Sequence, residues 1–127
     1  MIDTHCHLDA AEFDADRVEV YRQALAAGVS GIVVPAVALD GFANTRAVVA
    51  AHPGCVAAYG IHPLYVMQAA DADLVQLTDW LAAERPVAVG EIGLDYYVPG
   101  LDPVRQLHFY LAQLKLARRF ELPVLLH

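Results

Sequence analysis

The apolar residues of this chain fall into five short runs, separated by longer stretches in which apolar positions recur every three to four residues. Short runs rich in β-branched residues and bounded by turn formers are typical of buried strands, whereas the longer spacing is typical of amphipathic helices. The pattern therefore predicts five strands with helices between them. The predicted strands cover residues 1–5, 31–36, 55–60, 86–91 and 123–127.

The first two intervening stretches begin and end with helix signals. Asp14 or Asp16 can cap a helix that ends at Gly28, and Asp40 opens a second helix that stops at residues 52–54, His-Pro-Gly. Aspartate favours the start of a helix, and glycine and proline favour its end. The apolar face of the first helix consists of Val18, Tyr21 and Leu25.

The last two stretches also predict helices. Asp71 opens the third helix, and Asp102 followed by Pro103 opens the fourth, because an aspartate cap with proline in the first turn is a strong start signal. The apolar positions at helical spacing are Leu74, Leu77 and Leu81 in the third helix, which we expect to be buried, and Leu107, Leu111 and Leu114 in the fourth.

Strands that alternate with helices form right-handed βαβ units with a parallel sheet, and continuously apolar strands fit such a sheet because both of its faces are buried. Two architectures agree with this order: an open doubly wound sheet and a TIM-type (β/α) barrel. A barrel takes about 250 residues, so this chain would supply its first half. No linker or change of composition divides residues 1–127, which predicts one domain.

Composition limits the classes of partner. The chain has 127 residues, is 57% hydrophobic and carries a net charge of −7, with Lys115 as its single lysine. Coating nucleic acid takes many cations, so these values argue against that role, but not against an enzyme that holds a few phosphates at a metal ion. The longest apolar run is too short for a membrane span of about 20 residues. With two cysteines and no secretory leader, we expect a reducing cytoplasm.

Four of the five predicted strands end in a histidine or a carboxylate: the first runs into His5 and His7, the third into His62, the fourth into Glu91 and the fifth into His127. Ligands bind beyond the carboxyl ends of the strands in both architectures, so we expect these side chains to converge. Imidazole and carboxylate ligands suit zinc, manganese and other divalent first-row metals.

Several polar residues near the predicted strand ends also have a simpler interpretation. Glu91 could be a solvated loop carboxylate, although an unpaired charge in an apolar run is costly. His127 could be a hydrogen-bonded core histidine, and His62 could brace its Gly-Ile-His-Pro turn. Asp95 could form a turn, and the two tyrosines after it could cover the mouth of a barrel.

Three further candidates point away from a site. His52 and His108 lie on predicted helices, away from the carboxyl ends of the strands. Side chains alternate along a strand, so Cys6 faces opposite to its two histidine neighbours and is expected to be a buried core thiol.

The segments DTHCHLD, GIHP, GEIGLDYY, RQLHFYLAQLKLA and PVLLH follow one another in an order that resembles the TatD-type metal-dependent deoxyribonucleases, members of the amidohydrolase-like barrel superfamily. The resemblance covers the whole chain but only the front half of the family's barrel. It implies a TIM-type (β/α) barrel, with the first five strands and four helices present here. Residues 1–127 would then be the N-terminal part of a single metal-dependent hydrolase domain.

The resemblance also implies a site for two divalent metal ions, with zinc, manganese or magnesium as candidates. His5 and His7 would hold one ion, the catalytic carboxylate Glu91 would bridge both ions, and His127 would bind the second. Family members complete the site with a later histidine and a later aspartate, beyond His127. His62 matches a family histidine near the site and would bind a substrate phosphate.

These features predict a metal-dependent phosphodiester hydrolase, a deoxyribonuclease with exonuclease-like action on single-stranded or frayed DNA ends. One alternative is an amidohydrolase or aminoacyl-tRNA deacylase that acts on a small amide or ester. Another is a metal-free fragment that serves as a folding or interaction unit. Residues 1–127 alone are expected to be inactive, because the ligand set would be incomplete and the edge strands exposed.

Overall fold

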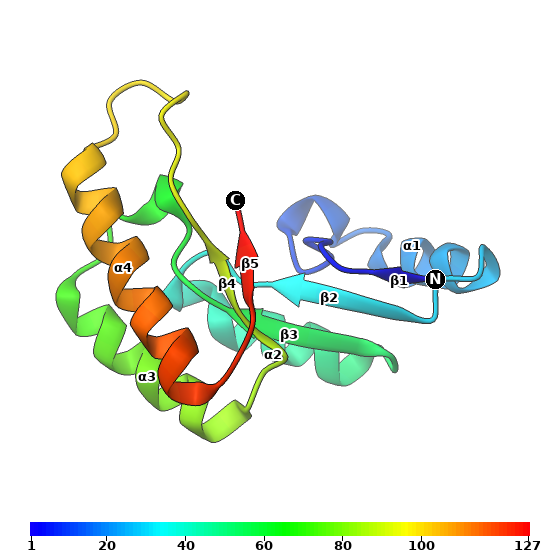
Figure 1. Cartoon of the computed structure of the whole chain (residues 1–127). Helices are drawn as coiled ribbons and strands as arrows, with labels where there is room; N and C mark the ends of the chain where they lie inside the picture. The colour runs from blue at the N-terminus through cyan, green and yellow to red at the C-terminus, as the bar shows by residue number, and fades with distance from the viewer.

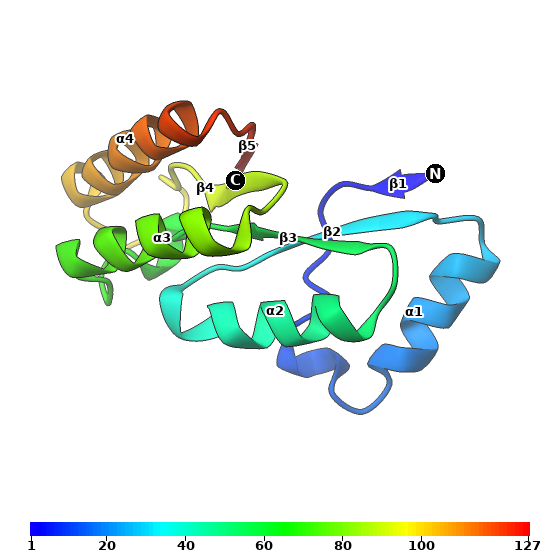
Figure 2. The same ribbon diagram turned by 90° about the horizontal axis from the view of Figure 1, so that it is seen from below.

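The computed structural model describes residues 1–127 and contains one sheet of five parallel strands, ordered β1-β2-β3-β4-β5. The strands are β1 (Ile2–Asp3), β2 (Gly31–Pro35), β3 (Cys55–Tyr59), β4 (Ala88–Ile92) and β5 (Val124–Leu126). The sheet curls, and the helices surround the outer side of the curl (Figures 1 and 2). Spatial order equals chain order, as in a (β/α) barrel and unlike a doubly wound sheet. The predicted half-barrel is therefore confirmed.

Four α-helices and three short 3₁₀ helices connect the strands. The α-helices are α1 (Arg17–Ala26), α2 (Phe42–Ala51), α3 (Asp71–Glu84) and α4 (Pro103–Phe120); the 3₁₀ helices are η1 (Ala11–Phe13), η2 (Leu39–Gly41) and η3 (Pro63–Tyr65). None of the helices is long and apolar enough to cross a membrane.

The start of α4 is the best predicted helix boundary. The carboxylate of Asp102 accepts hydrogen bonds from the N–H groups of Val104 and Arg105, as an aspartate cap should. The start of α1 differs in its chemistry: Asp16 occupies the cap position without a side-chain bond, and Asp14 pairs with Arg17 at 2.6 Å. The predicted starts at Asp16, Asp40, Asp71 and Asp102 all lie within two residues of the first residue of the corresponding α-helix, although the 3₁₀ helix η2 precedes α2.

The apolar positions of α1 and α4 are covered only in part. Val18 and Leu25 of α1 are 63% and 42% exposed, whereas Tyr21, which lies between them in the sequence, packs against the ring of His52. On α4 Leu107 and Leu111 are 43% and 46% exposed, while Leu114 packs against the buried core. The buried residues of α4 are Gln106, Phe109, Gln113 and Ala117. In α3 the prediction holds, since Leu77 and Leu81 are fully buried and Leu74 is partly buried.

The largest apolar cluster lies between the sheet and helices α2, α3 and α4. Its buried members are Ala36, Phe42, Tyr59, Leu77, Leu81, Val89, Ile92 and Ala117. The rings of Phe42 and Tyr59 lie 5.0 Å apart, and both contact the ring of Trp80. A second cluster around Ile32 and Val34 joins β2, β3 and the loop after β1 to α1 and α2. These clusters fix the strands whose ends carry the polar residues.

Two glycines allow the strands to approach closely at their carboxyl ends. A Cβ atom at Gly90 would lie 2.6 Å from the Cβ of Leu125 on β5, and one at Gly60 would lie 2.8 Å from Cγ2 of Ile92 on β4. Such contacts are too short for any larger residue. Strands β3, β4 and β5 therefore approach one another closely beside the polar residues at their carboxyl ends.

Candidate metal centre

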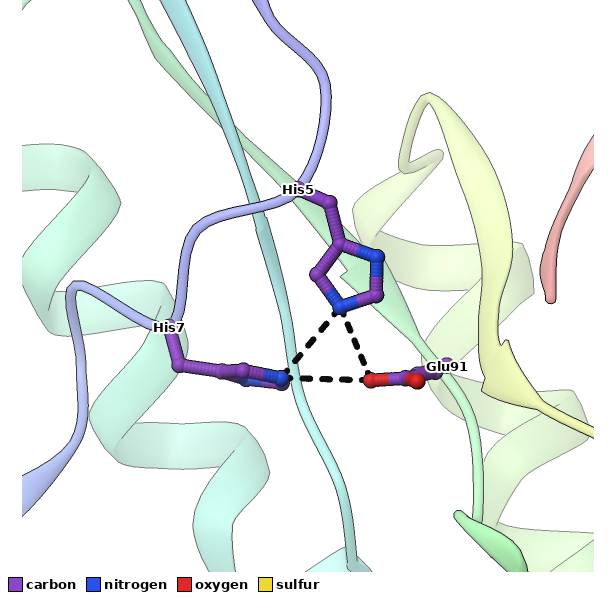
Figure 3. A group of neighbouring side chains, drawn as sticks. All are labelled: His5, His7 and Glu91. Atoms are coloured by element: carbon purple, nitrogen blue, oxygen red, sulfur yellow. Dashed lines mark hydrogen bonds and ion pairs between the residues drawn. The ribbon is translucent and has the colours of Figure 1, made fainter. Parts of the chain in front are cut away.

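Glu91 is the centre of the polar cluster at the carboxyl ends of the strands. It belongs to β4, and only 4% of its surface is exposed. Its Oε2 atom lies 2.9 Å from Nε2 of His5 and 3.1 Å from Nε2 of His7. Figure 3 shows the two rings and the carboxylate pointing toward one another. The sheet thus brings a buried carboxylate into contact with two imidazoles from the other end of the sequence.

His5 and His7 lie just beyond β1, which is shorter than predicted. Only Ile2 and Asp3 pair with β2 as a strand, and both are exposed at its edge. The predicted alternation nevertheless persists, because the N–H of Cys6 still donates to the carbonyl of Val33 at 3.1 Å. Cys6 therefore packs half-buried against the second apolar cluster, where burial raises the pKa of its thiol.

A backbone contact determines which nitrogen of His7 faces the carboxylate. Nδ1 of His7 lies 3.1 Å from the carbonyl oxygen of Pro35, which can only accept, so Nδ1 carries the proton. In the neutral ring Nε2 is then unprotonated, and its lone pair is directed at Glu91. Metal-binding histidines are oriented in this way by a backbone carbonyl on their second nitrogen.

His127 contacts the other carboxylate oxygen. Its Nδ1 lies 3.0 Å from Oε1 of Glu91, and its Nε2 lies 3.1 Å from Oδ2 of Asp95. Both carboxylates can only accept, so the protonated ring of His127 donates to Glu91 from Nδ1 and to Asp95 from Nε2. The two oxygens of Glu91 are therefore shared between histidines from opposite ends of the chain.

His62 lies beside His127, and its protonation is also determined by a backbone contact. The N–H of Leu64 donates to Nδ1 of His62 at 3.1 Å, so the proton of the neutral ring is on Nε2. That atom lies 3.0 Å from Nδ1 of His127 and 3.5 Å from Oε1 of Glu91. Burial lowers the pKa of His62 to about 4, which keeps the ring neutral at physiological pH.

The remaining pKa shifts follow from the same contacts. Burial alone would raise the pKa of Glu91, but the hydrogen bond from His127 and the neighbouring histidines outweigh burial and lower it. Burial would lower the pKa of His127, but its hydrogen bonds to Asp95 and Glu91 outweigh burial and raise it. Hydrogen bonds from the N–H of Val98 and from His127 lower the pKa of Asp95. The cluster thus combines ionised carboxylates with positions that attract positive charge.

The donor atoms fit divalent cations. Two groups of three, His5 with His7 and Glu91, and His62 with Glu91 and His127, each have ligand atoms within 4.8 Å of one another. In the first group the separations are 2.9, 3.1 and 3.3 Å, close to the ~3.3 Å expected between nitrogen ligands around a tetrahedral zinc ion. The spacing and the chemistry of these atoms are those of a group that could hold a metal ion.

The loop that follows His7 is tied to helices α1 and α2. Nε of Arg17 donates to the carbonyl of Leu8 at 2.7 Å. The hydroxyl of Thr45, which is fully buried, donates to the carboxylate of Asp9, and Nδ2 of Asn44 donates to the carbonyl of Asp9 at 2.9 Å. These bonds connect the segment just past the two histidines to both helices.

A cavity of about 670 Å³ opens beside the cluster. Histidines 7 and 62 lie in its wall, together with the rings of Phe13 on η1 and Tyr65 on η3. Polar groups from Asp9 and Asn44 also line it. The cavity can hold a ligand that reaches the donor atoms from one side.

The structure brings together all the site residues predicted from the sequence: His5, His7, His62, Glu91 and His127. His52 and His108 lie elsewhere, as expected: His52 bonds the carbonyl of Val48, and His108 pairs with Asp71 at 3.1 Å. The prediction did not include Asp95, which forms the expected turn, accepting from the N–H of Tyr97, and also contacts His127. Its position after the fourth strand was the only available signal.

A curled parallel half-sheet whose carboxyl ends carry imidazoles around a shared carboxylate is the arrangement of metal-dependent (β/α)-barrel hydrolases. The sequence matches the family described as TatD related DNase over residues 2–127. The chain belongs to this family.

Similar proteins and a similar structure support this assignment. The chain is 44% identical to YjjV of Escherichia coli K12, named an uncharacterized metal-dependent hydrolase, over 99% of this chain and 49% of that protein. It is 32% identical to the 3'-5' ssDNA/RNA exonuclease TatD of Cronobacter sakazakii, over 100% of this chain and 48% of that protein. The crystal structure of YjjV, a TatD homolog from E. coli, matches with a TM-score of 0.94 at 40% identity, covering 100% of this chain and 50% of that one. The chain spans about half the length of these relatives.

Proposed function

We propose that residues 1–127 are the N-terminal part of a single-domain, metal-dependent phosphodiester hydrolase that removes nucleotides from the ends of single-stranded or frayed DNA. The observation that carries this proposal is the position of Glu91, whose two oxygens contact histidines of two separate donor groups. A carboxylate that contacts two groups in this way suits a pair of cations, and paired cations are typical of nucleases and phosphatases.

In this proposal His5, His7 and Glu91 hold one divalent ion, and Glu91 and His127 hold the second. When bound, two divalent ions supply positive charge that stabilises the phosphodiester transition state and lowers the pKa of water. The nitrogen-rich donor set favours zinc or manganese over magnesium, which prefers oxygen ligands. Glu91 offsets the repulsion between the ions and acts as the catalytic carboxylate.

His62 binds the substrate in this proposal. Because its Nδ1 accepts from Leu64, its Nε2–H is a hydrogen-bond donor and has no lone pair to offer a cation. A neutral donor directed toward the centre can bond a non-bridging phosphate oxygen. The low pKa of about 4 keeps this donor uncharged across the physiological range.

The neighbouring cavity supports a single-stranded substrate. Phe13 and Tyr65 line it together with His7 and His62, and an unpaired base can stack on an aromatic ring at little cost in sequence specificity. The net charge of −7 favours binding of a few terminal nucleotides over contact with a long duplex. The name of the TatD relative, a 3'-5' ssDNA/RNA exonuclease, supports the same substrate class and adds RNA to it.

The test uses the complete protein, stripped of metal with a chelator and reloaded with Mn²⁺, Zn²⁺ or Mg²⁺. We expect release of mononucleotides from end-labelled single-stranded DNA, little action on blunt duplex DNA, and no activity without added metal. Hydrolysis of a small ester, an amide or an aminoacyl-tRNA, but not of DNA, would favour the amidohydrolase alternative. A folded protein that binds no divalent ion would contradict every enzymatic interpretation.

A further inference from the structure

Two glutamines on α4 are fully buried, although glutamine is usually exposed. Gln106 and Gln113 each expose about 1% of their surface, and they are the only residues of their type that are buried. They are seven residues apart, which is two helical turns, so both side chains lie on the same face of α4, about 10 Å apart along its axis. A buried carboxamide that lacks partners is costly, which makes their partners informative.

Gln113 pairs with the backbone next to His62. The N–H of Ile61 donates to Oε1 of Gln113 at 2.7 Å, and Nε2 of Gln113 donates to the carbonyl of Ile61 at 3.0 Å. One side chain therefore satisfies both polar groups of a fully buried residue at the end of β3. The residue that follows is His62.

Gln106 makes the same pair of bonds to Asp95. The N–H of Asp95 donates to Oε1 of Gln106 at 2.7 Å, and Nε2 of Gln106 donates to the carbonyl of Asp95 at 2.8 Å. The carboxamide is the side chain that can both accept and donate in the manner of a backbone amide. The two glutamines thus act on two different loops through identical contacts.

The two loops meet at one side chain. His62 contacts Nδ1 of His127 at 3.0 Å, and Asp95 contacts Nε2 of the same ring at 3.1 Å. α4 is also the helix that leads into β5 and His127. One face of one helix therefore bonds the backbone of Asp95 and of the residue before His62, the two residues that flank the His127 ring.

We propose that Gln106 and Gln113 are positioning residues that fix Asp95 and His62 against the two nitrogens of His127. The proposal rests on the function proposed above only in what it implies for catalysis. Groups that orient a metal-binding histidine are commonly worth about 10- to 100-fold in metal affinity or activity.

The test compares Gln113→Met and Gln106→Met in the complete protein, because methionine keeps the shape of glutamine but forms neither bond. Ala117→Gly is the control: it weakens the same helix on its buried face but touches neither loop. In metal-free protein, histidine-ring ¹⁵N spectra should show displaced signals for His62 and His127 with Gln113→Met, and for His127 with Gln106→Met. The control should displace neither signal, and no variant should displace those of His52 and His108.

Amide hydrogen exchange shows whether each substitution removed the intended bonds. Exchange should accelerate at Ile61 in Gln113→Met only, and at Asp95 in Gln106→Met only. Mn²⁺ titration should then show affinity reduced about 10- to 100-fold in both variants and little change in Ala117→Gly. Unchanged ring signals in folded variants with accelerated exchange would overturn the proposal.

Gln113→Glu and Gln106→Glu serve if the methionine variants do not fold, since glutamate still accepts from the backbone N–H. Smaller but equally selective ring displacements are expected for them, and their absence would also overturn the proposal. The ring spectra need no substrate, so they decide the role of the glutamines even if the protein does not hydrolyse DNA. In that case only the proposed function fails.

Discussion

Nε2 of His7 lies 3.1 Å from Oε2 of Glu91, although 84 residues separate the two in the sequence. Neither side chain is free to turn away. The carbonyl of Pro35 fixes the ring of His7, and β4 holds Glu91 in a fully buried strand. The contact is therefore a product of the sheet, and a cation that binds there meets ligands already in place.

Replacing Glu91 by glutamine should abolish metal binding and activity in the complete protein while leaving the fold nearly intact. Glutamine has the same shape but no charge, so it cannot offset the repulsion between two cations. We expect a loss of at least about 100-fold in hydrolysis of single-stranded DNA, together with loss of bound metal measured by elemental analysis. Glu121→Gln, an exposed change at the end of α4, is the control. Full activity of the Glu91→Gln variant would refute the assignment.

Asp95→Asn should weaken metal binding without unfolding the protein. The carboxylate that orients His127 is replaced by an amide, and the ring loses its charged partner. Outer partners of this kind contribute about 10- to 100-fold to affinity, which Mn²⁺ titration can measure. The matched control is Asp71→Asn, because Asp71 pairs with His108 at the same distance of 3.1 Å away from the site. Equal effects of the two substitutions would contradict the role of Asp95.

Gly90→Ala should destabilise the protein, because the new methyl group would lie 2.6 Å from the Cβ of Leu125 and must push β5 away from β4. We expect a loss of about 1–3 kcal/mol in urea unfolding. Gly41→Ala is the control, since nothing lies within 4 Å of a Cβ atom at that position. A Gly90→Ala variant as stable as the control would show that the strands can separate freely.

Tyr59 should make the protein sensitive to alkaline pH. Burial raises the pKa of its hydroxyl to about 12 from an ordinary value of 10. The neutral form is therefore favoured in the folded state, and the resulting stability is complete below about pH 10 and is lost as the pH rises through about 12. The change is on the order of 2–3 kcal/mol. Urea unfolding between pH 8 and pH 12 should show it, and the Tyr59→Phe variant should lack this component.

Residues 1–127, expressed alone, should self-associate and hold metal weakly. Ile2 on β1 and Leu126 on β5 are 64% and 55% exposed at the two edges of the sheet, and exposed parallel edges invite pairing with another chain. Sedimentation velocity and metal analysis measure both properties. A stable monomer with two tightly bound ions and robust DNA hydrolysis would be the contrary result.

Much of the fold could be predicted from the sequence because its strands are apolar and end in turn residues. β4 is a clear example: every residue from Ala88 to Ile92 is buried, so the run is continuous and the only charge within it, Glu91, stands out. The same reasoning found the histidines, since each comes directly after such a run. Parallel pairing then places all of these side chains at the end of the sheet where the strands have their carboxyl ends.

The contacts made by polar side chains could not be predicted in the same way. Hydrophobic spacing marks Leu107 and Leu111 as apolar positions of α4 and gives no reason to bury the glutamines, yet Gln106 and Gln113 are buried and the two leucines are nearly half exposed. Burial of Gln106 and Gln113 depends on backbone groups of distant loops, which no local pattern reveals. Asp95 was missed for a related reason, because one residue both forms a turn and orients a histidine.

Spatial order that equals chain order has a consequence for how the protein matures. His5 and His7 follow β1, Glu91 lies on β4 and His127 follows β5, so the full set of donors exists only when the sheet from β1 to β5 has assembled. A cation that binds these groups stabilises folded chains and has no comparable site in unfolded ones. Added metal should therefore protect chains whose strands pair in the correct register from proteolysis. Chains with an incorrect register should gain no such protection and be degraded first.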